Sequence, residues 1–135
     1  MATVKDVYAA VDQIAPFAAQ MDFDNAGFLV GRGEQQVTRL LVSLDITEEV
    51  VWEAVERGVE LIVSHHPIIF HPARSITDET SVGRIVLALA ERGIAAICAH
   101  TNLDASVGGV NDALADALGL TECTVLEPVS YTHLR

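Results

Sequence analysis

Two adjacent histidines, His65 and His66, stand between a short apolar run and a proline, and their position favours metal or acid–base chemistry. The run 60–64 is rich in β-branched residues, which is typical of a buried strand. Pro67 cannot continue the hydrogen-bond ladder, so we expect the strand to end at the histidines. Adjacent strand residues point to opposite faces, so both imidazoles meet at one site only where the chain turns. Pro67 gives a reason for that turn.

Polar residues also follow two other apolar runs. Asp45 comes after the run 37–44, and the segment from His100 to Asp104 comes after the run 94–99. The carboxyl ends of parallel strands meet at one edge of an open α/β sheet, where ligands and metals bind. Imidazole nitrogens with carboxylate oxygens suit zinc, iron, manganese, cobalt or nickel, whereas calcium and magnesium prefer oxygens alone.

A lone histidine in a core is more often a structural residue than a ligand. Two adjacent histidines and a His-to-Asp segment at equivalent strand ends favour the metal site instead. The candidate ligands are His65, His66 and Asp104. Three protein ligands suit a single catalytic ion but do not complete a two-metal site.

Other polar positions give weaker signals. His71 is a single histidine beside Pro72, and we expect it at the surface or in support of the site. Asp22, Asp24 and Asn25 form either a turn or a wall of the site, and turn preferences favour the turn. The segment 31–33 lacks the lysine and hydroxyl of a phosphate-binding loop.

The order of apolar runs and helical patterns defines the fold class. We expect helices at 3–14 (capped by Thr3), 48–57 (capped by Asp45 or Thr47), 82–92 and 110–118, and strands at 37–44, 60–64, 94–99 and 121–126. Short joints between strand, helix and strand imply parallel strands with right-handed crossovers. The sequence therefore predicts an α/β protein, layered α/β/α, with a mainly parallel sheet.

Composition narrows the function classes. The chain has 135 residues, which is enough for one domain with a buried hydrophobic core, and half of the residues are hydrophobic. A net charge of −11, from 19 acidic and 8 basic residues, argues against nucleic-acid binding but leaves room for a nucleotide held through a metal. Cys98 and Cys123 lack ligand-like spacing, so we expect reduced thiols in a cytoplasmic protein. We find neither a membrane-spanning run nor a signal peptide.

Three motifs together resemble the Nif-three-like dinuclear metal-centre family, whose members are often named type 2 GTP cyclohydrolase I. The motifs are residues 24–31, 64–70, and 99–104 followed by 108–112, and the similarity runs from about Thr3 to Leu126. The resemblance implies hexamers and a centre of two divalent metal ions, bound in part by His65, His66 and Asp104. The family's remaining ligands, a His and a Glu one helical turn apart, lie in the C-terminal half of its fold, and this chain has no such pair. Phe23 stands where the family usually has a tryptophan.

The resemblance implies a metal-dependent hydrolase, similar to GTP cyclohydrolase 1 type 2, that acts on a small molecule such as GTP or another nucleotide. Asp104 would be a carboxylate ligand, and His100 would be the catalytic residue, which orients a ligand or carries a proton near neutral pH. One alternative is a non-enzymatic metal-binding or regulatory adaptor. Another is a two-metal phosphoesterase, for which Asp22 and Asp24 only faintly match the expected Asp-rich motif.

The last seven residues, 129–135, resemble one reading frame of the transposon-end adapter used in sequencing-library preparation. We therefore expect a non-native tail at 129–135, preceded by an N-terminal α/β metal-binding half-domain at 1–128 of a longer fold. On its own, such a half-domain is expected to be inactive, to hold at most one weakly bound ion, and to self-associate through exposed apolar surface.

Overall fold

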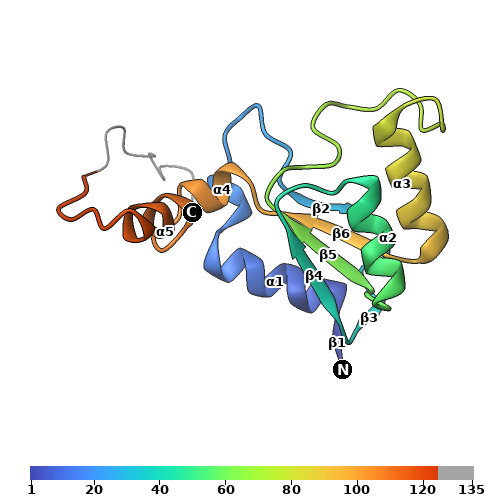
Figure 1. Cartoon of the computed structure of the whole chain (residues 1–135), viewed down its shortest axis with the longest axis horizontal. Helices are drawn as coiled ribbons and strands as arrows, with labels where there is room; N and C mark the ends of the chain where they lie inside the picture. The colour runs from blue at the N-terminus through green and yellow to red at the C-terminus, as the bar shows by residue number, and fades with distance from the viewer. Residues whose placement is uncertain (125–135) are drawn as a thin grey trace.

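The computed structural model describes residues 1–124 of the chain and confirms the α/β class (Figure 1). In chain order the elements are β1 (Ala2–Thr3), α1 (Val4–Ile14), the 3-10 turn η1 (Phe17–Ala19), β2 (Gly27–Val30), β3 (Gln36–Val37), β4 (Leu40–Ser43), α2 (Glu48–Glu56), β5 (Leu61–Ser64), α3 (Ser81–Arg92), β6 (Ala95–Cys98), α4 (Thr101–Asp104) and α5 (Val110–Ala117). No helix among residues 1–124 is long and apolar enough to cross a membrane.

The main sheet has the strand order β2-β6-β5-β4, in which β4, β5 and β6 are parallel. β2 pairs with β6 in the antiparallel direction and forms one edge of the sheet. This arrangement confirms the mainly parallel sheet. Its three parallel strands end at the same edge, from which Asp45, His65 and His100 follow in the chain.

The expected strand 37–44 is divided into β3 and β4, and β3 belongs to a small separate sheet with β1. The break falls at Thr38 and Arg39, whose backbone N–H groups donate to the Glu60 carboxylate at 3.1 Å and 2.8 Å. Because a side chain satisfies these two donors, the segment does not need a neighbouring strand there.

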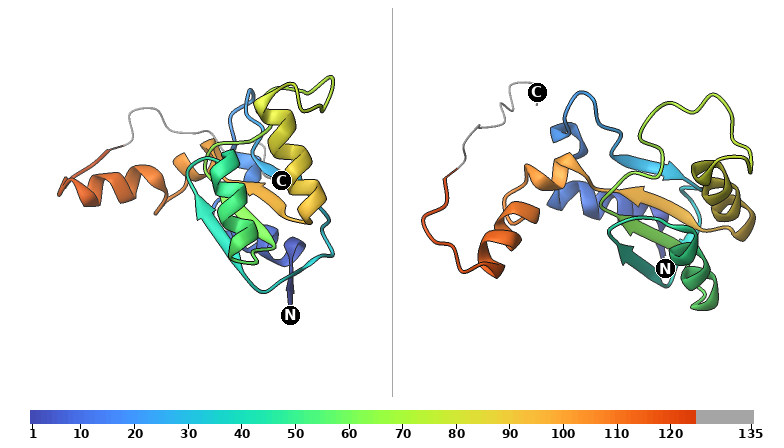
Figure 2. Two further views of the ribbon diagram at one scale, coloured as in Figure 1. Left: turned by 45° about the vertical axis from the view of Figure 1, so that its right-hand side comes forward. Right: turned by 45° about the horizontal axis from the view of Figure 1, so that its top comes forward.

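Helices cover both faces of the sheet: α1 lies on one face, and α2 and α3 lie on the other (Figures 1 and 2). Ile62 of β5 packs into the cluster with α2 and α3, whereas Leu61 packs into the cluster with α1. All four residues of β6 are buried. A parallel strand buried on both faces reads as a continuous apolar run, which is why the sequence identified these strands.

Local sequence signals mark several helix ends. Thr3 caps α1 and forms a capping box with Asp6. Thr47, and not Asp45, caps α2, because its side chain accepts from the Val50 backbone N–H. Helix α3 ends at Gly93, whose φ of 65° is the left-handed conformation that favours glycine.

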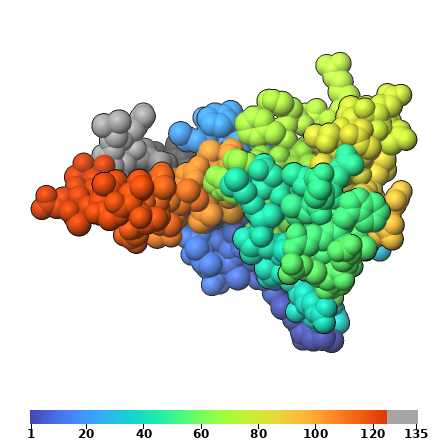
Figure 3. Space-filling view, in the orientation of Figure 1, coloured from blue at the N-terminus to red at the C-terminus, as the bar shows by residue number. Residues whose placement is uncertain are grey.

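Helix α5 extends away from the sheet and forms an arm on the body of the molecule (Figure 3). It has no buried residue. The expected strand 121–126 is wrong for its described part: residues 121–124 form no strand, because the arm carries them away from every strand that could pair with them. Residues 125–126 and the expected tail 129–135 lie outside the described residues.

Exposed apolar side chains in the described part of the chain include those on α5 and those along β4. Leu114 and Leu118 are exposed on the α5 arm. Leu40, Val42 and Leu44 are exposed along β4, at the edge of the sheet opposite β2. An unpaired edge with apolar side chains is a favourable place for further protein to pack.

Candidate metal centre

The end of β5 delivers both adjacent histidines to one side. The backbone N–H groups of His65 and His66 still donate to Ser43 and Leu44 at the end of β4, at 3.2 Å and 2.9 Å. The chain bends at these residues, and the Ser64 hydroxyl donates across the bend to the His66 carbonyl at 2.9 Å. The two rings consequently lie only 5.1 Å apart, centroid to centroid. This confirms the expected turn before Pro67.

The end of β6 continues into α4, a single helical turn that the sequence analysis did not predict. Asn102 is fully buried there; its side chain accepts from the His100 N–H at 2.9 Å and donates to the Ala15 carbonyl at 2.7 Å. These bonds tie the turn to the end of α1. Because His100 and Asp104 are four residues apart on a helical turn, they lie on the same side of it.

Three histidines meet where β5 and β6 end. His65, His66 and His100 each offer a ligand atom, and these atoms all lie within 4.8 Å of one another. Asp104 lies beside them, with its Oδ1 3.6 Å from His65 Nε2. The structure therefore brings together all four residues that the sequence assigned to the site. The His66 side chain is 47% exposed, so the cluster opens to solvent on that side.

Each of the three rings uses Nδ1 to contact an oxygen of the protein. His66 Nδ1 lies 2.7 Å from Asp45 Oδ1, and His100 Nδ1 lies 2.9 Å from Asp24 Oδ1. His65 Nδ1 lies 2.9 Å from the Ala99 carbonyl oxygen. A carbonyl or carboxylate oxygen only accepts, so each Nδ1 is the donor in its contact, and Nε2 is the ring nitrogen left to face the cluster. Metal-binding histidines have this arrangement, and the donor set therefore fits a divalent ion.

Asp24 is a wall of the site, which corrects the preference for a simple turn. Its side chain is inaccessible to solvent and accepts from the Thr101 backbone and hydroxyl as well as from His100. Burial alone would raise the pKa of Asp24, but the bonds from Thr101, His100 and Asn25 outweigh it and hold that pKa below its usual value. No local sequence pattern indicates this role, because Asp24 and His100 are 76 residues apart.

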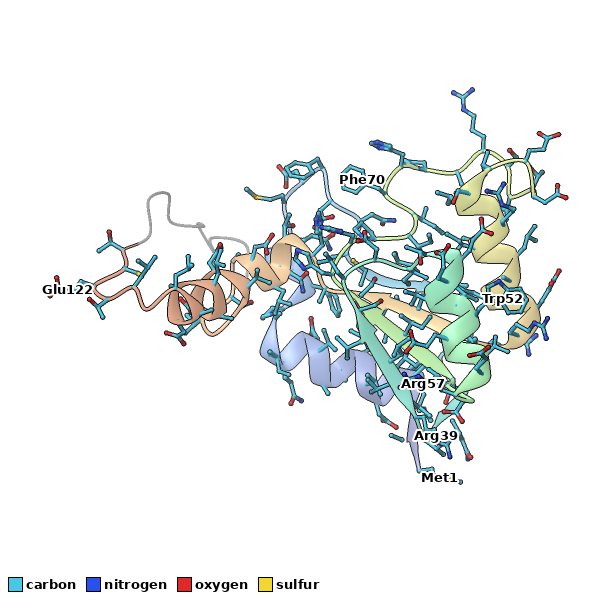
Figure 4. All side chains as sticks on the ribbon, in the orientation of Figure 1. Met1, Arg39, Trp52, Arg57, Phe70 and Glu122 are labelled. Carbon is cyan, nitrogen blue, oxygen red and sulfur yellow. The ribbon has the colours of Figure 1, made fainter. Side chains whose placement is uncertain are left out.

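The loops around the cluster are joined to each other. The Asn25 side chain donates to the Ile69 carbonyl at 2.5 Å and so links the loop before β2 to the loop after β5. Phe70 lies in the second loop (Figure 4). Its ring centroid is 6.2 Å from that of His100. His71 is exposed and contacts Phe70 at 4.8 Å between centroids, which places it at the surface next to the site, as expected.

The sequence and the fold identify the family of this protein. Residues 2–134 match the family model Duf34/NIF3 (NGG1p interacting factor 3). The chain belongs to this family. The GTP cyclohydrolase 1 type 2 homolog of Halalkalibacterium halodurans is 42% identical over 134 residues, which are 99% of this chain and 36% of that relative.

Solved structures of NIF3-family proteins have the same fold. The Bacillus cereus protein related to NIF3 is 37% identical, with a TM-score of 0.91 over 96% of this chain and 36% of its own. Staphylococcus aureus protein SA1388 is also 37% identical, with a TM-score of 0.88 over 93% of this chain and 41% of its own. The chain thus spans about a third to a half of the length of the relatives that it matches.

A cavity adjoins the histidine cluster in this NIF3-family chain. Its volume is about 420 Å³, within the range of small-molecule sites, and both Asp45 and His66 line it. The other lining residues include the apolar Ile46, Pro67, Ile68, Val82 and Ile85, and Thr47 and Ser81 at the beginnings of α2 and α3. A small molecule in this cavity would lie directly beside His66.

Cys98 is close to the cluster but does not suit a metal ligand. It is fully buried, and burial together with the charge of Asp24 raises its pKa to about 12. The thiol therefore stays protonated, and it donates to the His65 carbonyl at 2.9 Å. Cys98 supports the backbone of His65, and the imidazoles and Asp104 remain the candidate ligands.

Proposed function

We propose that this chain is the N-terminal half of a metal-dependent hydrolase with a dinuclear centre. The observation that carries the proposal is the cluster of His65, His66 and His100, whose ligand atoms lie within 4.8 Å of one another while each Nδ1 contacts a protein oxygen. A cluster with only a structural role would not need three imidazoles that all turn the same nitrogen, Nε2, away from their Nδ1 partners.

His65, His66 and Asp104 are the proposed ligands, in agreement with the family resemblance. Their nitrogen and oxygen atoms suit zinc, iron, manganese, cobalt or nickel. When bound, divalent ions supply a Lewis acid and activate water for attack. His100 is the proposed catalytic residue: Asp24 holds its Nδ1, so its Nε2 is available to accept or release a proton at the centre or to orient a ligand.

The remaining ligands would come from the second half of the longer protein. The chain spans 36% and 47% of two curated relatives, and the exposed apolar surfaces on α5 and β4 are suitable for packing against that half. In this proposal residues 1–128 are the half-domain and 129–135 a non-native tail. The whole protein would be a cytoplasmic homo-oligomer, a hexamer by resemblance.

The proposed substrate is a small molecule, such as GTP or another nucleotide. The names of the relatives support a nucleotide, and the cavity of about 420 Å³ beside His66 is large enough for a small molecule. Because the chain carries a net charge of −11, a phosphate group would approach favourably only after divalent ions had neutralised part of the site. The same charge argues against nucleic acid as a partner.

The test compares the full-length protein with this 135-residue chain. Metal content is measured by mass spectrometry, affinity by calorimetry, and turnover by a screen of nucleotides and phosphoesters. We expect two ions and hydrolysis for the full-length protein, and at most one weakly held ion and no turnover for the chain alone. His66→Ala in the full-length protein should weaken metal binding, whereas His71→Ala, at an exposed histidine, should not.

Two results would contradict the proposal. Unchanged affinity for both ions in His66→Ala would remove the metal assignment. A full-length protein that binds two ions but hydrolyses none of the compounds would favour the non-enzymatic adaptor instead.

A further inference from the structure

Two aspartates contact the outer nitrogens of the histidine cluster from different parts of the chain. Asp45, just after β4, contacts His66, and Asp24, before β2, contacts His100. We propose that Asp45 and Asp24 are positioning residues: Asp45 keeps the proton of His66 on Nδ1 and leaves its Nε2 for the metal, and Asp24 does the same for His100, whose Nε2 then faces the centre as the proton carrier. This inference rests on the proposed metal centre and assigns it two further residues.

Asp45 has no other evident task in the described structure. Thr47 caps α2 in its place, and the Asp45 side chain is 53% exposed. Exposed ion pairs contribute little to folding stability, so stability alone does not explain a carboxylate held at 2.7 Å from His66 Nδ1. The contact does make Nδ1 the donor and leaves Nε2 as the ring nitrogen that faces away from Asp45.

The proton position matters because a metal binds only an unprotonated ring nitrogen. A neutral imidazole without a fixed acceptor distributes its proton over both nitrogens, and each molecule with the proton on Nε2 must rearrange before it binds an ion. Partners that fix the tautomer of a ligating histidine typically change metal affinity by about 10- to 100-fold.

His65 provides an internal reference for the same effect. Its Nδ1 contacts the Ala99 backbone carbonyl at 2.9 Å, an acceptor that no side-chain substitution at Asp45 or Asp24 removes.

Asp24 also accepts a hydrogen bond from the Thr101 backbone, so replacing Asp24 would disturb that loop as well as His100. The exposed Asp45 therefore gives the cleaner test.

The experiment uses the 135-residue chain with ¹⁵N-labelled histidine. Asp45→Ala removes the acceptor, Asp45→Asn keeps a carbonyl acceptor without the charge, and Asp116→Asn removes one exposed charge on α5 as a control. Long-range ¹H–¹⁵N spectra in mildly alkaline, metal-free buffer report the tautomer of each ring. Calorimetric titration with Zn²⁺ then reports affinity.

We expect His66 to carry its proton on Nδ1 in the wild type, in Asp45→Asn and in the Asp116→Asn control. In Asp45→Ala the proton should move largely to Nε2, while His65 stays unchanged. Zn²⁺ affinity should fall by about 10- to 100-fold in Asp45→Ala and only slightly in Asp45→Asn.

An unchanged His66 tautomer in Asp45→Ala would overturn the inference, whatever the metal affinity. The inference would also be overturned if Asp45→Asn and Asp45→Ala lost the same Zn²⁺ affinity while the His66 tautomer stayed unchanged in both. Asp45 would then act through its charge. If the wild-type chain and the full-length protein bind no Zn²⁺, the proposed function fails, and the metal-free spectra still decide whether Asp45 sets the tautomer.

Discussion

Replacing Asn102 with alanine should destabilise the fold and weaken metal binding together. Asn102 is fully buried, and its side chain joins the His100 N–H to the Ala15 carbonyl at 2.9 Å and 2.7 Å. Alanine makes neither bond. The variant therefore leaves a backbone donor at the site and a buried backbone acceptor at the end of α1 without these partners.

The size of the effect follows from these two groups. A buried polar group without a partner costs about 1–3 kcal/mol, so two of them cost roughly 2–6 kcal/mol before any water enters. We expect a loss of about 3 kcal/mol in the free energy of unfolding, which is a large part of the stability of a typical domain. His100 should also shift, because its backbone loses the bond that fixes its position at the start of α4.

Urea unfolding followed by circular dichroism measures the first effect, and Zn²⁺ titration measures the second. Asn111→Ala is the matched control: this exposed asparagine donates to the Asp104 carbonyl at 2.9 Å, and losing such a bond costs about 1 kcal/mol or less. If Asn102→Ala costs no more than Asn111→Ala, the buried bonds do not hold the site, and our account of α4 is wrong.

Three further predictions concern other parts of the fold. Gly83→Ala should lower the melting temperature although alanine favours helices, because the new Cβ would overlap the Thr77 carbonyl oxygen; a higher melting temperature would contradict this. Hydrogen bonds from Arg39 and Thr38 hold the pKa of Glu60 below its usual 4.5, so Glu60 stabilises the fold at neutral pH. Glu60→Gln should therefore be less stable than the wild type at neutral pH, and this difference in the free energy of unfolding should vanish as the pH falls through the lowered pKa. A difference in urea unfolding that does not change with pH would refute this prediction. Val42→Lys, at a side chain 73% exposed on β4, should reduce self-association in sedimentation velocity, and unchanged association would exclude this edge as the contact.

The sequence predicted those parts of the fold that depend on local patterns. The strands β5 and β6 are buried on both faces and therefore appear as continuous apolar runs, and Thr3, Thr47 and Gly93 are local signals for helix ends. The convergence of His65, His66, His100 and Asp104 followed from topology, because parallel strands end at the same edge.

The features that the sequence does not predict depend on contacts between distant residues. Local turn preferences favour a turn at Asp24, because its site partner His100 is 76 positions away in the chain. Helix α4 is one turn long, too short for any hydrophobic period, and Asn102 holds it through the distant Ala15. The division between β3 and β4 likewise depends on Glu60, 22 positions from Thr38.

The Nδ1 contacts of the three histidines all join remote positions: 21 residues separate His66 from Asp45, 34 separate His65 from Ala99, and 76 separate His100 from Asp24. These pairs exist only after the sheet has formed, so an unfolded chain presents no comparable site. An ion that binds the folded cluster alone shifts the folding equilibrium by mass action, by about 2.7 kcal/mol at a hundred times its Kd. The urea midpoint should then rise with the logarithm of the free-ion concentration and fall on addition of a chelator. Under the proposed metal binding, the free-ion concentration around the protein would therefore set how stable its sheet is.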